Sequence, residues 1–416
     1  MRRRFLLKPL VSGVLMILSG IMMPLQAQNN TTETGDKWGI QWSGFIKNDC
    51  WWDTRQVYTS REDLFLLYPL NELLDRAGED INSGAVYNFS AMTSRLTAGF
   101  TAPDALGAKI SGVVEGDFSG VTNNDINGFR LRHAYGKMTW KHAELLAGQY
   151  WHPLFTPDVA PTVASLNTGA PFQPFNRTPL ISLTGIFGKF RILGAFITQR
   201  DNASDGPYGI TSTYMRNAIV PNLHLQAQFK NAHHIAGLGA DFKVLKPNKV
   251  YDNRVISEPL ATYAFLAWYK MNYGDFCLKL KGIYGQNLSE HLLLGGYSPT
   301  IIFSEHPIER YTPSNHFFSW AQLSYGKKIQ GYLFGGYAKN LGTSQANSGT
   351  YYGRGSDVAY LYRITPGVMA MFNKLQVNLE TEYTVAAYGT PDINGIVRNS
   401  KEIANLRLLM TVLYYF

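Results

Sequence analysis

The segment ANLRLLMTVLYYF, residues 404–416, ends the chain and decides how the rest of the sequence is interpreted. With a period of two residues, one face of this segment is nearly all apolar: Ala404, Leu406, Leu408, Met410, Val412, Tyr414 and Phe416. The opposite face carries Asn405, Arg407 and Thr411. This alternation predicts a β-strand with one apolar and one polar side. A strand of about 9–11 residues crosses a bilayer when it is tilted, and terminal aromatic residues lie at the interface. An edge strand of a soluble sandwich is the alternative, but the same pattern recurs along the chain.

Residues 1–27 have the composition of a secretory signal peptide. The segment MRRRFLLK, residues 1–8, is basic, and the apolar stretch over 11–25 is too short for a full helical span. The small residue Ala27, in the segment LQA (25–27), predicts signal-peptide cleavage after this position. A short periplasmic segment, residues 28–37, then precedes the first strand. Removal of residues 1–27 eliminates four basic residues and no acidic one, so the formal net charge falls from +8 to +4. The basic character therefore belongs largely to targeting, and we expect no nucleic-acid partner.

The remaining composition favours a β-barrel in a membrane. No apolar run of eighteen or more residues follows the signal, so no transmembrane helix is expected. Tyr (25), Phe (23), Trp (8) and Gly (39) are abundant, as aromatic girdles and curved strands require. The two cysteines, Cys50 and Cys277, are predicted on opposite faces of the wall, so no disulfide and no role is assigned to them.

Strand-like segments joined by alternating short turns and long loops run through the chain. The expected strands are residues 38–55, 81–101, 109–118, 129–140, 143–152, 179–187, 189–199, 214–230, 234–245, 260–273, 276–286, 316–326, 329–339, 357–372, 375–387 and 402–416, with a long charged loop near 60–80. An even number of strands, short turns at one end and long loops at the other are typical of bacterial outer-membrane barrels. The fold class is therefore all-β: a transmembrane antiparallel up-and-down barrel of about sixteen strands over residues 38–416.

The alternation also predicts which side chains face the lumen. In LQVNLETEY, residues 375–383, the inward set is Gln376, Asn378, Glu380 and Glu382. In LHLQAQFK, residues 223–230, it is His224, Gln226, Gln228 and Lys230. Some sixteen strands enclose a lumen too wide for wall side chains to fill. The polar lumen is therefore expected to hold water and to form a channel.

Many cations are predicted on the inner face: Arg95, Lys109, Arg130, Arg132, Lys279, Lys281, Arg363 and Arg407. Four acids, Glu115, Asp117, Glu380 and Glu382, share that face. Guanidiniums in a narrow pore concentrate positive potential and bind carboxylates or phosphates in a bidentate manner. This set predicts a preference for small anions. The alternative is that the arginines form salt bridges with wall carboxylates and only stiffen the barrel.

Residues 153–178 form the longest non-strand stretch after the fifth expected strand. The segment has five prolines, only two charged residues and several apolar ones, so it is expected to pack against other parts of the protein. Its candidates for lining a constriction are Trp151, Asp158, Asn167, Gln173, Asn176 and Arg177. An outer lid or a contact between subunits is the alternative.

Several sequence blocks resemble the DcaP-like porins of Gram-negative outer membranes. They are NGFRLRHAYG (127–136), LLAGQYW (145–151), FTPD (155–158), SRL (94–96), VEGDF (114–118) and GFIKND (44–49). The resemblance covers residues 38–180. It implies a homotrimer of sixteen-stranded barrels, in contact with outer-membrane lipid and lipopolysaccharide, that passes small anionic solutes such as dicarboxylates. In porins the third outer loop narrows the barrel, and residues 153–178 lie in that place. The terminal Phe416 resembles an outer-membrane assembly signal.

Some members of that family begin with a periplasmic coiled coil, for which residues 28–37 are too short and too polar. Trimer contacts are then expected on the barrel wall, at Ile40, Trp42, Gly44 and Ile46.

Other function classes have less support. No Ser/His/acid group converges on neighbouring strand ends, so a barrel hydrolase remains only an alternative to a channel. A structural or adhesive barrel with a plugged lumen is a third possibility. The nine histidines are scattered and predict no metal site, and no phosphate-binding glycine loop is found. The expected protein is a passive diffusion channel for small hydrophilic solutes, without cofactor or catalytic residues.

Overall fold

A computed structural model describes residues 38–121, 123–200, 202–256, 258–301 and 310–416. The expected signal peptide (1–27), its cleavage point near Ala27 and the segment 28–37 lie outside the described residues. Within those ranges no helix has the length and apolar character needed to cross a membrane.

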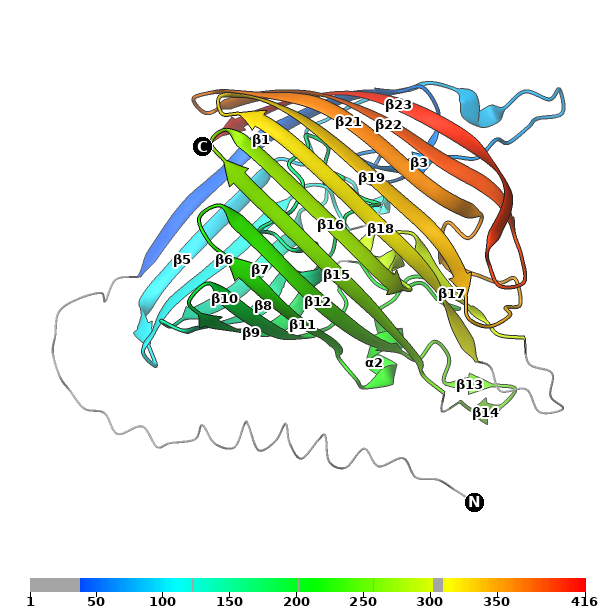
Figure 1. Cartoon of the computed structure of the whole chain (residues 1–416), viewed down its shortest axis with the longest axis horizontal. Coiled ribbons are helices and arrows are strands. Elements are labelled where there is room, and N and C mark those ends of the chain that lie inside the picture. The colour runs from blue at the N-terminus through cyan, green and yellow to red at the C-terminus, as the bar shows by residue number, and fades with distance from the viewer. Residues whose placement is uncertain (1–37, 122, 201, 257, 302–309) are drawn as a thin grey trace, which may run out of the picture. The chain divides into compact units, whose positions relative to one another are not determined.

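The described residues form a closed antiparallel barrel with sixteen strand positions (Figure 1). The strands are β1 Gly39–Asp53, β4 Val86–Ser90 continued by β5 Arg95–Ala105, β6 Ala108–Asp117, β7 Arg130–Thr139, β8 Ala143–Trp151, β9 Arg177–Phe187, β10 Phe190–Ile197, β11 Asn222–Lys230, β12 His234–Leu245, β15 Leu260–Tyr273, β16 Phe276–Gln286, β18 Tyr311–Gly326, β19 Ile329–Thr343, β21 Val358–Phe372, β22 Leu375–Pro391 and β23 Val397–Tyr415. Strand β1 pairs with β23, from Phe45 opposite Tyr415 to Asp53 opposite Arg407, and closes the sheet. The expected fold class is confirmed.

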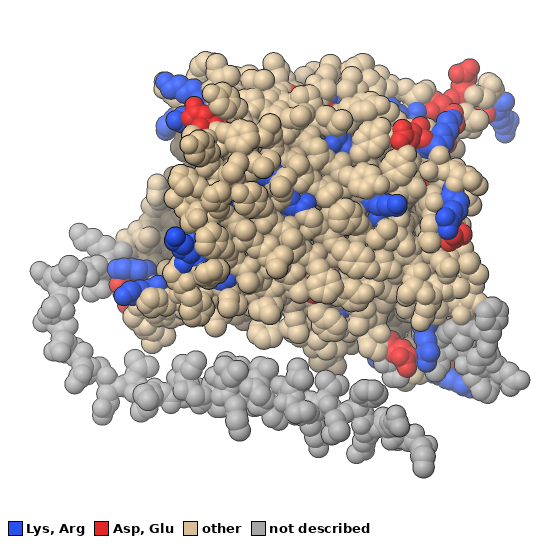
Figure 2. Space-filling view, viewed as in Figure 1, with Lys and Arg blue, Asp and Glu red and all other residues tan. Residues whose placement is uncertain are grey.

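Side chains alternate between the two faces of the wall as the sequence pattern predicts. In β23, Leu408 and Met410 are exposed on the outer face, whereas Arg407 and Thr411 are buried on the inner face. The face seen in Figure 2 is mostly uncharged, and its acidic side chains lie near the margins. An apolar exterior with a polar interior is typical of a barrel that contacts lipid.

Several expected strands have different boundaries in the structure: those expected over 316–326, 329–339 and 375–387 extend further at the loop end, to Tyr311, Thr343 and Pro391, and three others differ as follows. The segment 214–230 starts as the helix α2, Thr213–Ala218, and Ile219 in a left-handed conformation ends that helix before β11 begins. The segment 81–101 starts with a 3-10 turn, Ile81–Ser83, and is interrupted between β4 and β5. The last strand begins at Val397 instead of residue 402, because it continues its pairing with β22 beyond the membrane-crossing part.

The loop end of the barrel contains secondary structure that the sequence pattern did not predict. The expected charged loop near 60–80 includes a hairpin of β2 and β3, where the apolar run FLLYP forms the second strand. These short elements are β2 Val57–Ser60, β3 Phe65–Pro69, β13 Val250–Tyr251, β14 Arg254–Val255, β17 Gly295–Pro299, β20 Tyr352–Arg354 and the 3-10 turns Asn123–Asp125, Pro153–Phe155 and Ser289–His291.

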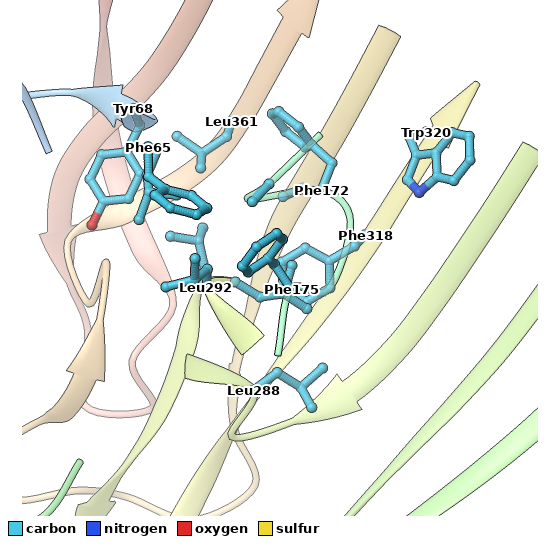
Figure 3. Close-up of a cluster of buried hydrophobic side chains, with 14 of the residues drawn as sticks. Phe65, Tyr68, Phe172, Phe175, Leu288, Leu292, Phe318, Trp320 and Leu361 are labelled. Atoms are coloured by element: carbon cyan, nitrogen blue, oxygen red, sulfur yellow. The ribbon is translucent and has the colours of Figure 1, made fainter. Parts of the chain in front are cut away.

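Three loops fold into the lumen from that end: L1 (residues 54–85), L3 (152–176) and the start of L6 (287–294). Their apolar side chains pack on one another and on the inner wall in one buried cluster (Figure 3). Figure 3 labels members from L1 (Phe65, Tyr68), L3 (Phe172, Phe175), L6 (Leu288, Leu292) and the wall (Phe318, Trp320, Leu361). L3 lies inside the barrel as expected for residues 153–178, whereas the apolar cluster with L1 and L6 was not expected, because loops supply the apolar side chains that wall strands alone could not.

A buried ion pair joins the last strand to the first. Arg407 donates from Nη2 and Nε to Asp53, with its shortest contact 2.6 Å to Oδ2, and its Nη1 donates to the Asp63 carbonyl of L1 at 2.8 Å. Both partners are at most 1% exposed. Removal of one partner would leave the other as an uncompensated buried charge, which typically costs about 3–5 kcal/mol.

We expect Arg407→Leu to lower the free energy of unfolding by about that amount, 3–5 kcal/mol. Denaturant unfolding in phospholipid vesicles, followed by tryptophan fluorescence, measures the change. The matched control is Arg398→Leu, which breaks the more exposed Arg398–Asp392 pair and should change stability far less, because solvent screens an exposed ion pair. Equal effects of the two variants would contradict a closing role for Arg407.

Candidate functional site

Lysines on the inner wall hold the backbone of L3 across the lumen. Lys281 of β16 donates to the Leu154 carbonyl at 2.5 Å and the Phe155 carbonyl at 3.1 Å. Lys279 of the same strand donates to the Ala160 carbonyl at 2.8 Å. From the opposite side, Lys47 of β1 donates to the Ala164 carbonyl at 3.1 Å. The inner faces of β1 and β16 are therefore connected through L3, and these ammonium groups satisfy carbonyls that would otherwise be buried without a donor.

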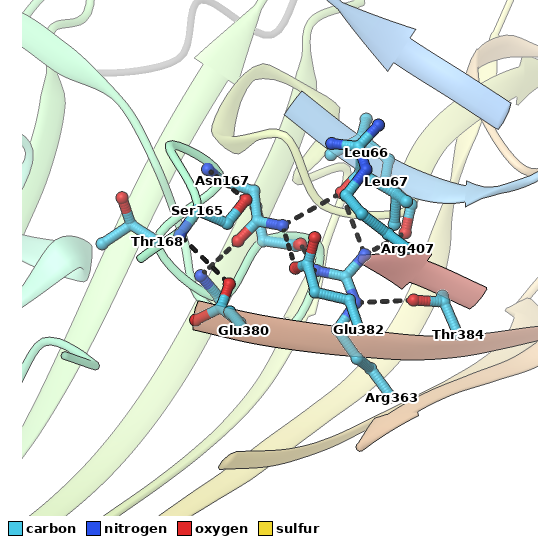
Figure 4. A network of polar contacts seen from close by, with 12 residues as sticks. Leu66, Leu67, Ser165, Asn167, Thr168, Arg363, Glu380, Glu382, Thr384 and Arg407 are labelled. Carbon is cyan, nitrogen blue, oxygen red and sulfur yellow. Dashed lines mark hydrogen bonds and ion pairs between the residues drawn. The ribbon is translucent and has the colours of Figure 1, made fainter. Parts of the chain in front are cut away.

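Two carboxylates of β22 hold the middle of L3 (Figure 4). Glu380 accepts hydrogen bonds from the backbone N–H of Ala164 at 2.7 Å and of Ser165 at 3.1 Å, and from the Tyr332 hydroxyl. Glu382 accepts from the Asn167 side-chain amide at 2.6 Å. The two carboxylates therefore satisfy donors of L3 that would otherwise be buried without an acceptor.

Arg363 of β21 connects L1 and L3. Its guanidinium donates to the Leu66 and Leu67 carbonyls at 2.9 and 3.0 Å and to the Ala170 carbonyl at 2.9 Å. It also contacts Glu382 at 3.2 Å. The same group therefore neutralises a wall carboxylate and fixes two loops.

The arginines of β5 and β7 lie together with the two acids of β6. Arg130 contacts Asp117 at 2.7 Å, and Arg132 contacts Asp117 at 2.6 Å and Glu115 at 2.8 Å. Arg95 lies 3.5 Å from Glu115. In this arrangement the guanidiniums are engaged by wall carboxylates, as the salt-bridge alternative describes. Lys109 lies apart from the other seven cations, where it pairs with Asp104 beside the short turn between β5 and β6.

Five of the six candidate residues in and beside L3 pack rather than line open space. Trp151 stacks on Phe155 with ring centroids 3.8 Å apart, and the Arg177 guanidinium lies 4.7 Å above Trp151. The buried amides each have a partner: Asn167 at Glu382, Gln173 at the Phe155 carbonyl (2.5 Å) and Asn176 at the Asn202 carbonyl (3.4 Å).

Asp158 differs from the other five because it borders an open cavity. This cavity has a volume of about 190 Å³ and lies between L3 and strands β8–β11. It is lined by Glu144, Tyr150, Thr156, Pro157, Asp158, Thr184, Ile186, Arg191, Leu193, Gln226 and Gln228. Asp158 accepts from Gln228 at 3.1 Å and Lys230 at 2.9 Å. We call this space the lumen chamber.

Arg191 is the lumen-chamber residue that the sequence interpretation missed. It lies on the inner face of β10 and is half-buried. Within the described residues its guanidinium has no hydrogen bond or ion pair, although it lies close enough to Asp158 to interact electrostatically. Alternation within FRILGAFI, residues 190–197, could have placed Arg191 inward. Unlike the arginines of β7 and β21, it therefore has no hydrogen bond or ion pair with a wall carboxylate in the described ranges, and it borders the chamber.

Loss of the Glu380 contacts is expected to loosen L3. Glu380→Gln leaves one acceptor and introduces an amide N–H that would face the N–H of Ala164 or Ser165. We expect the free energy protecting these two amides to fall by about 1.5–3 kcal/mol. Hydrogen exchange of residues 153–178, followed by mass spectrometry, measures it. Glu402→Gln, at an exposed carboxylate that accepts from Tyr360, is the matched control. Unchanged exchange in Glu380→Gln would show that L3 is held without this contact.

Sequence comparisons give no family: no family model and no curated protein matches the chain. Solved structures give the fold. The outer membrane channel DcaP of Acinetobacter baumannii is 15% identical with a TM-score of 0.66, covering 91% of this chain and 97% of that chain. The anion-selective porin from Comamonas acidovorans is 12% identical with a TM-score of 0.54, covering 91% and 100%. The outer membrane protein OmpT of Vibrio cholerae is 10% identical with a TM-score of 0.55, covering 92% and 99%. The described part of the chain therefore has a DcaP-like porin fold.

Proposed function

We propose that the protein is an outer-membrane porin, a non-enzymatic channel for passive diffusion of small hydrophilic solutes. The observation that carries this proposal is a closed sixteen-stranded barrel whose polar inner face holds a loop inside the lumen. L3 is then the constriction, and the lumen chamber is the part of the pathway that meets the solute. The fold shared with a channel and an anion-selective porin supports the same function.

Anion preference follows from the charges around the lumen chamber. Arg191, Glu144 and Asp158 line the chamber, and three lysines contact these two acidic residues: Lys137 pairs with Glu144, Lys230 pairs with Asp158, and Lys270 donates to the Asp158 carbonyl. The basic groups outnumber the acidic ones, and the low-dielectric wall concentrates their potential in a narrow space. The buried arginines of β7, β21 and β23 add less, because carboxylates partly neutralise them. Small carboxylates, including dicarboxylates, fit this charge balance.

The remaining expectations concern the membrane and the assembly. The exposed apolar side chains of the outer wall would contact outer-membrane lipid and lipopolysaccharide after signal-peptide removal near Ala27. Ile40, Trp42 and Ile46 lie exposed on β1, and together with Gly44 they offer a flat surface for a homotrimer. Native mass spectrometry in mild detergent tests the assembly, and a monomeric mass would contradict it.

A structural barrel with a plugged lumen is the second candidate. It is favoured by the buried cluster that L1, L3 and L6 form inside the barrel. The two candidates differ in whether the space beside L3 continues as a path for solutes.

Planar-bilayer recording of the purified protein decides between these functions. We expect stepwise conductance, and solute uptake into proteoliposomes should accompany it. Absence of both would favour the plugged barrel. Absence of conductance together with hydrolysis of ester or peptide substrates would identify a barrel enzyme instead.

Selectivity is tested by the reversal potential in a KCl gradient. We expect an anion-preferring potential in the wild type, which Arg191→Gln shifts toward zero because it removes a chamber charge without removing a wall salt bridge. Arg398→Gln, at an exposed residue near the start of β23 and outside the chamber, is the control. The double variant Arg130→Ala, Arg132→Ala tests whether that pair touches solutes or only braces the wall. Cation preference in the wild type would refute the charge argument.

A further inference from the structure

Three histidines that are far apart in the sequence meet on the inner wall. His152 begins L3, His224 lies on β11 and His291 lies in L6, and all three are buried. The ring centroids of His152 and His291 are 4.6 Å apart, and those of His152 and His224 are 6.2 Å apart. Within the described ranges no group of three or more His, Cys, Asp or Glu side chains could hold a metal ion. The histidine cluster therefore needs another explanation.

A chain of hydrogen bonds fixes the protonation of His152. Asn222 donates from Nδ2 to Asp241 Oδ1 at 2.7 Å and to the Phe242 carbonyl at 2.9 Å, so its Oδ1 is the acceptor. His152 Nε2 lies 2.8 Å from that oxygen and must carry a hydrogen. His152 Nδ1 accepts from the backbone N–H of Leu154 at 3.2 Å. An imidazole that donates at one nitrogen and accepts at the other is neutral.

The acceptor role of Nδ1 connects the wall to the first turn of L3. Leu154 lies in the 3-10 turn Pro153–Phe155 that opens the loop. A proton added to Nδ1 would turn this acceptor into a donor that faces the Leu154 N–H. The hydrogen bond to the loop would be lost, whereas the contact between His152 and Asn222 could remain.

The surroundings of His152 disfavour its charged form. The groups that face it are His224 of β11, Asp241 and Lys243 of β12, and Glu290 and His291 of L6, with Lys281 of β16 facing His291. Glu290 is already paired with Lys243. Burial lowers the pKa of His152 to about 4, although Asp241 acts in the opposite direction. Burial likewise holds the pKa of His291 well below its usual range.

The sign of the pH effect follows from these shifts. A histidine released to solvent titrates near about 6.5, so the released loop binds more protons than the attached loop once the pH falls below that value. Attachment is therefore fully favoured above about pH 6.5 and weakens as the pH falls toward 4.

We propose that His152 is a proton-sensitive latch: it holds the Leu154 N–H in the first turn of L3 against the β11–β12 wall and releases this N–H on acidification, so that the turn is left with its Lys281 contacts to the wall and loosens. The latch requires only the observed hydrogen-bond chain, so it can be tested separately from channel function.

Hydrogen exchange of residues 153–178 between pH 7.5 and 4.5 tests the latch, with wild type and His152→Asn measured at each pH so that the intrinsic exchange rate cancels. Asparagine can keep an oxygen acceptor for the Leu154 N–H but does not titrate. We expect equal protection at pH 7.5 and a progressive loss in the wild type, at most about tenfold for each pH unit below 6.5. His142→Asn, at an exposed histidine in the turn between β7 and β8, should behave as wild type. The same pH dependence in wild type and His152→Asn would overturn the proposal.

A second comparison uses the wild type alone and covers the case that His152→Asn does not fold. Exchange of residues 153–178 is compared with exchange of β18 in the same sample at each pH. A larger loss of protection in L3 than in β18 below pH 6.5 supports the latch. An equal pH dependence of the two segments would overturn it.

Discussion

The barrel can hold loops in its lumen because charged side chains of the wall satisfy the hydrogen-bonding groups of the loop backbone. A loop inside a protein brings N–H and C=O groups that sheet pairing does not use, and each is costly when buried alone. Here lysines and arginines donate to carbonyls, as Lys281 does at Leu154 and Arg363 at Leu66. Glu380 accepts from backbone amides. The inward apolar side chains of L1, L3 and L6 can then form a dry cluster around these contacts.

This use of charge changes how the inner face should be interpreted. A row of inward arginines suggests a surface for anions, but most of these guanidiniums already have carboxylates or carbonyls as partners. Asp117 receives contacts from both Arg130 and Arg132, and Glu115 from Arg132, so most of the local positive charge is neutralised. In the proposed channel, a group such as Arg191 matters more for a passing solute, because its guanidinium forms no ion pair with a carboxylate of the described wall. Pore selectivity then depends on the few inward charges that the architecture leaves over.

The sequence predicted the architecture better than the site, and the reason is the range of the interactions. A period of two residues fixes which face of a strand is polar, so the sixteen positions and the inward direction of Glu380 or Arg363 follow from local pattern. The hydrogen-bond partners of those side chains do not follow from local pattern. Arg363 and Leu66 are 297 residues apart, and Lys281 and Leu154 are 127 residues apart. The hairpin of β2 and β3 was missed because neighbouring charges hid the apolar run FLLYP. The meeting of His152, His224 and His291 has no local signal, since two of the three lie in loops.

The attachments of L3 differ in what can release them. Arginine contacts, such as those of Arg363, keep their donors through the physiological pH range. His152 contributes an acceptor that exists only while the ring is neutral. The contact between His152 and the Leu154 N–H therefore responds to protons, while Lys281 of β16 contacts the Leu154 and Phe155 carbonyls of the same turn. The first turn can then loosen beside β11 and β12 while Arg363 still holds the Ala170 carbonyl near the end of L3. The lumen chamber lies against this same wall, so a change at His152 would reach the part of the lumen that holds Arg191 and Asp158.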